Sequence, residues 1–201
     1  MNLFLDSSVD LIIGILDSNY RWVEYSQIGG ASAGRNLHKL LLEALTRVQL
    51  EIKDIKNFFL INGPGSYTGV RVTEGFGKVA EICKGRIFSF HHHQIPFLSG
   101  RYDQGAFISN AFKGEYFVHQ WLGSKGESKL ISADELHAEI VELKIKYSEI
   151  FCNGSIEDLH PTLELIKGEG EVILKQVEQR NLREKAFYYR AEKDEFKVKK
   201  K

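Results

Sequence analysis

The chain has 201 residues, of which 43% are hydrophobic and 27% charged, an ordinary composition for one large domain or two small lobes. Its 27 basic residues balance its 27 acidic ones, which excludes a global basic field for nucleic acid. No apolar stretch approaches the ~20 residues that span a bilayer, and no secretion signal is expected, so we expect a cytoplasmic protein without a membrane partner. Cys83 and Cys152 lie among apolar neighbours and are expected to be buried free thiols.

Hydrophobic patterning predicts three strands, a helix, a strand and a helix in the first half, followed by one more strand. The expected strands cover residues 2–6, 11–16, 21–27, 57–62 and 86–90, and the expected helices cover 35–50 and 67–83. A flexible loop is expected at 29–34.

The second half repeats this order. Its expected strands cover residues 106–109, 115–121, 128–131 and 149–152, and its expected helices cover 133–146, 156–167 and 172–185. The strand before each second helix ends in Asn-Gly, at Asn62-Gly63 and Asn153-Gly154. Strands that alternate with helices after a three-strand meander predict an α/β protein with two lobes, residues 1–100 and 101–201, each with a mixed sheet.

The most informative segment is Gly63–Arg71, which follows the strand 57–62 and opens the helix 67–83. Glycine and proline favour a tight turn there, and Ser66 can cap the helix. A glycine turn before a helix also suggests an anion site. However, the Lys of a phosphate loop is replaced by Arg71, and Gly69 falls at the wrong interval for a dinucleotide turn. A structural turn is therefore favoured, with the residues Gly63, Pro64, Gly65, Ser66, Thr68, Gly69 and Arg71.

The sequence GPGSYTGVR of this turn resembles the GPGSFTGLR signature of the TsaB (YeaZ) family. Weaker matches to that family occur in order at 5–8, 109–116 and 186–190. The resemblance implies a duplicated actin-like fold, with two lobes that each carry a mixed sheet flanked by helices. It also implies a noncatalytic subunit that binds TsaD, the enzyme that transfers a threonylcarbamoyl group to an adenosine of tRNA. TsaE and tRNA would join only through the complex.

In the TsaB family, the two helices that correspond to 35–50 and 67–83 dock TsaD. Small residues of the second helix would let a partner approach closely, and Leu42 lies opposite the main apolar stripe of the first helix. The expected interface residues are Arg35, His38, Leu42, Gly69, Thr73, Gly77, Lys78, Ala80 and Glu81. The competing interpretation places one apolar stripe of helix 67–83 on the sheet and the other against helix 35–50. Glu74 and Glu81 depart from the small or apolar residues usual in the family, which favours a more polar interface.

The motifs of catalysis are incomplete. Nucleotide-binding proteins of this architecture carry D-x-G-[ST] in the first hairpin, whereas this chain has Asp6-Ser7-Ser8-Val9, and the second-lobe turn Asn153–Ser155 has one glycine. Asp6 is expected to be a turn residue rather than a metal-linked carboxylate. Of the run His91–His93, at most His91 and His93 can converge, so no metal site is expected.

No serine or cysteine nucleophile with a histidine is apparent, and the sequence therefore predicts no catalytic residue and no cofactor. Two alternatives stay open. One is a small ATP-dependent kinase or ATPase of the same architecture, and the other is a homodimeric structural protein. The lysine-rich tail 193–201 is expected to be a solvated end, with a contact to the tRNA backbone as the alternative.

Overall fold

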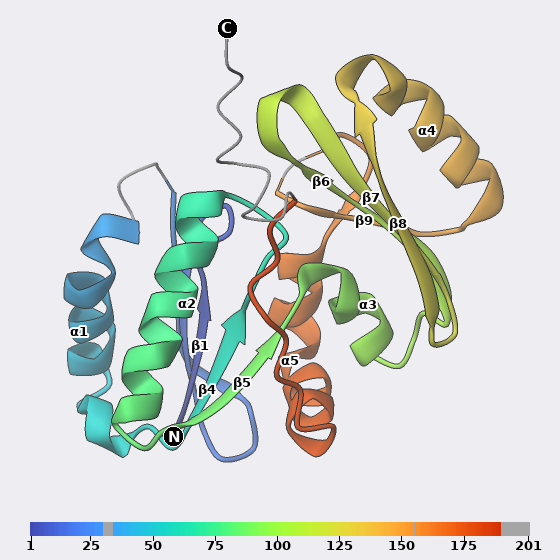
Figure 1. The fold of residues 1–201 in the computed structure, drawn as a ribbon. Helices are drawn as coiled ribbons and strands as arrows, with labels where there is room; N and C mark the ends of the chain where they lie inside the picture. Colours follow the sequence, from blue (N-terminus) through green and yellow to red (C-terminus); the bar gives the residue numbers. More distant parts are fainter. Residues whose placement is uncertain (30–33, 155, 190–201) are drawn as a thin grey trace, which may run out of the picture.

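The computed structural model describes residues 1–29, 34–154 and 156–189, which form two five-stranded sheets with helices against them (Figure 1). The first sheet has the order β3-β2-β1-β4-β5. Its strands are β1 (Asn2–Asp6), β2 (Leu11–Leu16), β3 (Trp22–Ile28), β4 (Asn57–Ile61) and β5 (Arg86–Phe90). Strands β1 to β3 form an antiparallel meander, and β1, β4 and β5 are parallel, with Leu3 opposite both Ile15 and Phe58.

The second sheet has the order β10-β9-β6-β7-β8. Its strands are β6 (Gln104–Asn110), β7 (Glu115–Leu122), β8 (Lys125–Ser132), β9 (Ile150–Asn153) and β10 (His160–Pro161). Here too the first three strands are an antiparallel meander and the last two run parallel to the first. The predicted duplicated architecture of two mixed sheets is confirmed, whereas the lobe boundary near residue 100 stays a prediction.

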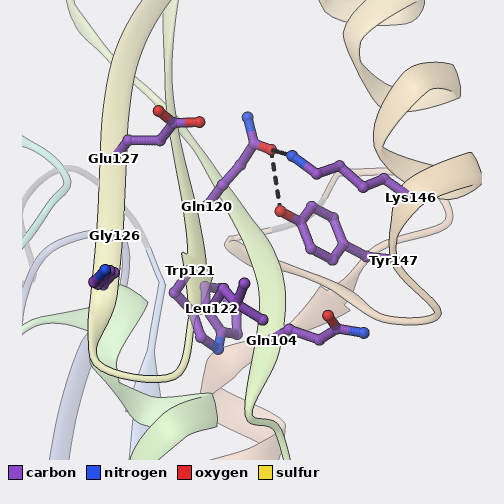
Figure 2. Close-up of a pocket in the computed structure, with 9 residues that line it drawn as sticks. Gln104, Gln120, Trp121, Leu122, Gly126, Glu127, Lys146 and Tyr147 are labelled. Carbon is purple, nitrogen blue, oxygen red and sulfur yellow. Dashed lines mark hydrogen bonds between the residues drawn. The ribbon is translucent and has the colours of Figure 1, made fainter.

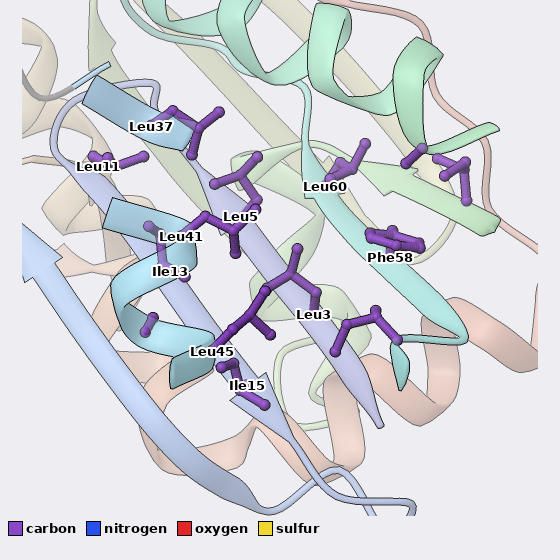
Figure 3. Packing of buried hydrophobic residues seen from close by; sticks show 14 residues of the cluster. Leu3, Leu5, Leu11, Ile13, Ile15, Leu37, Leu41, Leu45, Phe58 and Leu60 are labelled. Atoms are coloured by element: carbon purple, nitrogen blue, oxygen red, sulfur yellow. The ribbon is translucent and has the colours of Figure 1, made fainter. Parts of the chain in front are cut away.

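The first sheet is covered on both faces. Helices α1 (Leu37–Arg47) and α2 (Tyr67–Ile82) lie on one face, over a cluster that includes Leu5, Leu41 and Leu60 (Figure 3). The long helix α5 (Thr162–Gln179) covers the other face and buries Phe4, Phe59, Phe88 and Phe90. A helix from the second half of the chain therefore completes the core of the first lobe, as Figure 1 shows.

The remaining helices are α3 (Ile95–Leu98), which packs on α5, and α4 (Ala133–Lys146), which packs on the second sheet. Within the described residues, no helix is both long and apolar enough to cross a membrane.

The predicted break between helices 156–167 and 172–185 is present as a kink at Glu169, whose φ and ψ are not helical, but the predicted outer bounds are wrong, because α5 begins at Thr162 and ends at Gln179. The reason lies at Pro161, which ends the short strand β10 and precedes the first helical residue. Proline disfavours the helical conformation for the residue before it, so residues 156–160 cannot lead smoothly into the helix.

After α5 the chain returns across the molecule as residues 182–189, here called the return segment. Its backbone joins β5, since Ser89 N–H donates to the Leu182 carbonyl and Glu184 N–H donates to the Ser89 carbonyl, both at 3.0 Å. Further along, Tyr189 Oη donates to the Asn110 carbonyl of the second sheet at 2.7 Å. The return segment thus links the two lobes.

Candidate functional site

The turn Gly63–Arg71 lies between β4 and α2. Gly63 has φ +91°, a conformation that favours glycine, and the Ser66 side chain accepts the Gly69 N–H at 3.4 Å at the start of the helix. Gly63 and Pro64 are buried, while Thr68 and Arg71 are exposed.

This turn packs directly on the hairpin between β1 and β2. Ser66 N–H donates to the Ser8 carbonyl at 2.7 Å, and Ser7 Oγ donates to the Gly69 carbonyl at 2.7 Å. Added side chains would not fit: a Cβ at Gly65 would lie 2.5 Å from Ser8 Cβ, and a Cβ at Gly69 would overlap the Ser7 carbonyl oxygen. The glycines are therefore needed because the hairpin and the helix touch. The hairpin that holds phosphate in nucleotide-binding members of this architecture is here covered by the protein's own chain.

Asp6 lies at the end of β1 and is fully buried. Its Oδ1 accepts the Ser8 N–H at 2.8 Å, which is the turn contact expected for an aspartate at this place. In the part of the chain that the structure describes, no group of three or more His, Cys, Asp or Glu side chains is arranged to hold a metal ion.

A buried histidine joins this hairpin to the second lobe. His92 Nε2 lies 2.7 Å from Ser8 Oγ and 3.1 Å from Asp6 Oδ2, and its Nδ1 lies 2.9 Å from Thr162 Oγ1. Thr162 donates its own proton to the Cys152 carbonyl, so the imidazole Nδ1–H must donate to Thr162. The network therefore connects the β1–β2 hairpin to the first turn of α5.

The structure thus brings together a serine, a histidine and an acid that the sequence analysis did not connect, since Ser8 and His92 are 84 positions apart. Their geometry differs from that of a catalytic triad, in which serine and acid contact opposite ring nitrogens. Ser8 and Asp6 meet the same nitrogen of His92, and all three side chains are buried. We interpret this cluster as a structural tie.

Asn153, at the end of β9, adds a second tie between the lobes. Its Nδ2 donates to the Pro64 carbonyl at 2.6 Å and to Ser8 Oγ at 3.3 Å. In the first lobe, Asn62 likewise donates, here to the Glu184 carbonyl at 2.9 Å. The two matched Asn-Gly turns therefore both hold segments from the other half of the chain.

Two residues of the run His91–His93 converge, as predicted, but the segment is not extended: His92–Gln94 form a 3-10 turn that His91 precedes. The rings of His91 and His93 have centroids 5.1 Å apart, and His119 of β7 joins them at 4.4 Å from His93. Burial lowers the pKa of all three, and for His93, whose pKa lies well below its usual value, the neighbouring His119 adds to the effect. No sequence pattern predicted that His119, 26 positions after His93, would join this cluster.

The helix pair α1 and α2 presents an exposed apolar face. Leu42 of α1 is 65% exposed, and on α2 Val79 is 59% and Ile82 81% exposed. Arg35 and His38 are exposed at the start of α1. Val79 and Ile82 were not among the predicted interface residues, because the spacing of Val79 had assigned it to the apolar stripe with Val72 and Phe76.

The small residues of α2 lie inside the lobe, contrary to the expectation that they face a partner. Thr73 and Ala80 are buried, and a Cβ at Gly77 would lie 2.7 Å from Leu60 Cδ1 of β4. Gly69 is covered by the hairpin. The physical reason is that small side chains let α2 approach the sheet closely, while the larger Val72 and Phe76 pack beside α1, as the competing interpretation held.

Two further predicted interface residues are exposed but engaged within the chain. Lys78 Nζ lies 3.0 Å from Glu74 Oε1, and Glu81 Oε1 accepts Arg183 of the return segment at 3.0 Å. Cys83 is exposed rather than buried, because α2 ends at Ile82 and Cys83 only caps it. Cys152 is buried as predicted. Residues 30–33, Ser155, Arg190 and the tail 193–201, on which parts of the sequence analysis rested, lie outside the described residues.

A cavity of about 320 Å³ lies between the β7–β8 hairpin and the end of α4 (Figure 2). Its polar side chains are engaged with one another, since Gln120 Oε1 accepts Lys146 Nζ at 2.9 Å and Tyr147 Oη at 3.2 Å. This cavity is therefore a weak candidate for a ligand site.

No protein-family model matches the chain, and no curated protein matches it. Among solved structures, an uncharacterized protein with similarity to peptidase YeaZ from Pseudomonas aeruginosa superposes with a TM-score of 0.62 at 16% identity. That superposition covers 94% of this chain and 100% of the other. YeaZ from P. aeruginosa matches with a TM-score of 0.49 at 20% identity, over 66% of this chain and 65% of that one.

The repeated strand order and the superposition over nearly the whole chain define a two-lobed α/β protein with a duplicated actin-like fold. Its fold is that of the YeaZ-similar protein, and at this level of identity the likeness concerns the fold alone.

Proposed function

We propose that this chain is a noncatalytic subunit of the TsaB (YeaZ) type. It binds TsaD in the cytoplasmic complex that makes threonylcarbamoyladenosine in tRNA, with TsaE and tRNA recruited through the complex. The resemblance of Gly63–Arg71 to the family signature and the shared fold of a YeaZ-similar protein support this proposal. The subunit needs no cofactor of its own.

The observation that carries the proposal is that the two helices α1 and α2 carry three large apolar side chains in water, Leu42, Val79 and Ile82. Neighbouring apolar side chains that remain in water gain free energy when a partner covers them. Arg35 and His38, at the N-terminal end of α1, are exposed and would supply polar groups for the rim of an interface on this helix.

The burial of Ser7 and Ser8 in the β1–β2 hairpin supports the absence of catalysis, and the cavity of about 580 Å³ beside them, lined by Val9, Gly65 and Asn153 among others, is the place where a nucleotide would have to be tested. A nucleotide would need backbone N–H groups of the β1–β2 hairpin to be open to its phosphates. Here Ser66, Gly69 and Thr73 contact that hairpin instead. A kinase or ATPase would require the turn and α2 to withdraw from it.

The proposal is tested by binding to the TsaD homologue of the same genome, with Ile82→Glu and Leu42→Glu as variants. Truncation of an interface anchor can cost ~2 kcal/mol, so we expect the Kd for TsaD to rise by roughly 30-fold or more. Ile145→Glu is the matched control, because Ile145 is 84% exposed but lies on α4 of the other lobe. All three variants should melt like the wild type, because each side chain is exposed.

Normal TsaD binding by both variants would place the docking surface elsewhere. A homodimer that Ile82→Glu dissociates, without any binding of TsaD by the wild type, would favour the homodimeric alternative. Micromolar ATP binding by the isolated protein in calorimetry would favour the kinase or ATPase.

A further inference from the structure

A second cavity, of about 390 Å³, lies where the two lobes meet beneath the β7–β8 turn. Residues from the segment between the lobes, from β7 and from the end of α5 line it. The lining residues that matter for the argument are His93, Phe97, His119, Trp121, Lys125 and Arg180. This volume lies in the range typical of small-molecule sites.

The charged side chains of this cavity are both basic. Lys125 and Arg180 line it, and no Asp or Glu of the described chain does. Arg180 Nε donates to Gln176 Oε1 at 3.2 Å, and its guanidinium lies 5.2 Å from the centre of the Phe97 ring. Neither cation has a carboxylate partner among the described residues. The cavity is therefore electrostatically suited to an anion.

Two histidines, His93 and His119, also line the cavity. His93 Nδ1 is buried and has no hydrogen-bond partner within the described ranges, while His119 Nδ1 lies 2.8 Å from Ser128 Oγ. Burial keeps both rings largely neutral at pH 7 by lowering their pKa. Glu184, whose carboxylate accepts Gln94 Nε2 at 2.9 Å, does not line the cavity. A bound anion would favour protonation of these rings.

The walls are flat and apolar. Trp121 is held in place because its Nε1–H donates to the Tyr102 carbonyl at 3.0 Å, and Phe97 also lines the cavity. A Cβ at Gly126 would lie 2.6 Å from His119 Cε1, so the glycine lets the β7–β8 turn rest on the imidazole. Such walls suit the faces of a planar ring.

We propose that this cavity binds a small organic anion, a carboxylate or a phosphate monoester carried on a planar aromatic body. The Arg180 guanidinium donates to the anionic oxygens, the Lys125 ammonium adds a second positive charge, and the body lies beside Trp121 and Phe97. This site is independent of the proposed binding of TsaD, because its lining shares no residue with the face formed by Leu42, Val79 and Ile82.

The test is calorimetry of the full chain at pH 7 with phenyl phosphate, and with benzoate to separate the two kinds of anion. Inorganic phosphate is the probe for charge alone, and benzyl alcohol is the probe for the ring alone. We expect phenyl phosphate or benzoate to bind at least about tenfold more tightly than inorganic phosphate and benzyl alcohol. The pKa values of His93 and His119, followed by NMR of the ring protons, should rise when the ligand saturates the protein.

Arg180→Gln should weaken the binding by about tenfold or more, because the positive charge of the guanidinium and its paired N–H donors are lost. Arg183→Gln is the matched control, since Arg183 lies three positions further along and pairs with Glu81 away from the cavity. Lys125→Gln, on an exposed turn, provides a second variant if Arg180→Gln melts at a lower temperature. Absence of saturable binding of both anions up to about 10 mM, or binding that neither variant weakens, would overturn the proposal.

Discussion

Replacement of Gly69 by alanine should loosen the contact between α2 and the β1–β2 hairpin. The new Cβ would overlap the Ser7 carbonyl oxygen, and that atom belongs to backbone that cannot rotate away. The helix and the hairpin must therefore separate by more than 1 Å, on the order of the overlap with a normal van der Waals contact.

This separation breaks three hydrogen bonds that cross the contact, those of Ser66 N–H to the Ser8 carbonyl, of Ser7 Oγ to the Gly69 carbonyl and between Ser7 Oγ and Thr73 Oγ1. At about 1 kcal/mol each, their loss costs ~3 kcal/mol. Alanine recovers up to about 1 kcal/mol through its higher helix propensity. The free energy of unfolding should therefore fall by about 2 kcal/mol, which lowers the Tm of a chain of this size by roughly 4–8 °C.

Urea unfolding followed by circular dichroism measures this change. Gly75→Ala is the matched control, because Gly75 lies in the same helix and a Cβ there would meet no atom within 4 Å. It should raise the free energy of unfolding by about 0.5–1 kcal/mol. Equal stability of the two variants would refute the argument that the signature glycines exist for close packing.

Two further predictions concern titration and thiol reactivity. Because the folded-state pKa values of His91, His93 and His119 lie below the usual 6.5, the unfolded chain binds more protons between those values and 6.5. The contribution of these histidines to the free energy of unfolding should therefore be fully present above about pH 6.5 and be lost as the pH falls below it. His119→Gln should make this loss smaller in urea unfolding between about pH 7.5 and 5.5. A loss of stability on the alkaline side would contradict the argument. A chromogenic disulfide reagent should titrate one thiol in the native protein, the exposed Cys83, and both thiols in denaturant, because Cys152 is buried and burial raises its pKa; two fast thiols in the native protein would contradict this.

Most of the fold could be predicted from the sequence because its strands are nearly continuous apolar runs. The strands Asn2–Asp6, Leu11–Leu16 and Arg86–Phe90 lie at their predicted positions, since strands of a sheet that helices cover on both faces need apolar residues on both faces. For the last helix, Gly168 and Gly170 correctly indicated the kink at Glu169, whereas the predicted ends were wrong because tertiary packing on the first sheet decides where the helix begins and ends.

The site was harder to predict, because its contacts join residues far apart in the chain. The sequence marked Leu42 as an apolar residue left over on α1, and it is exposed. It could not show whether the small or the large residues of α2 face the sheet, since both make stripes of helical period. Nor could it place His119 beside His93, or Ser8 beside His92, because these contacts depend on how the two lobes meet.

The position of α5 has a consequence for how this chain is made. When the five strands of the first sheet and the helices α1 and α2 have left the ribosome, the face of the sheet that α5 will cover is still exposed. Phe4, Phe59, Phe88 and Phe90 stay open to water until Thr162–Gln179 has emerged. The two halves share one topology, yet the first half to be synthesised can complete its hydrophobic core only after the second half has been made. Until then its exposed apolar face can bind chaperones or aggregate.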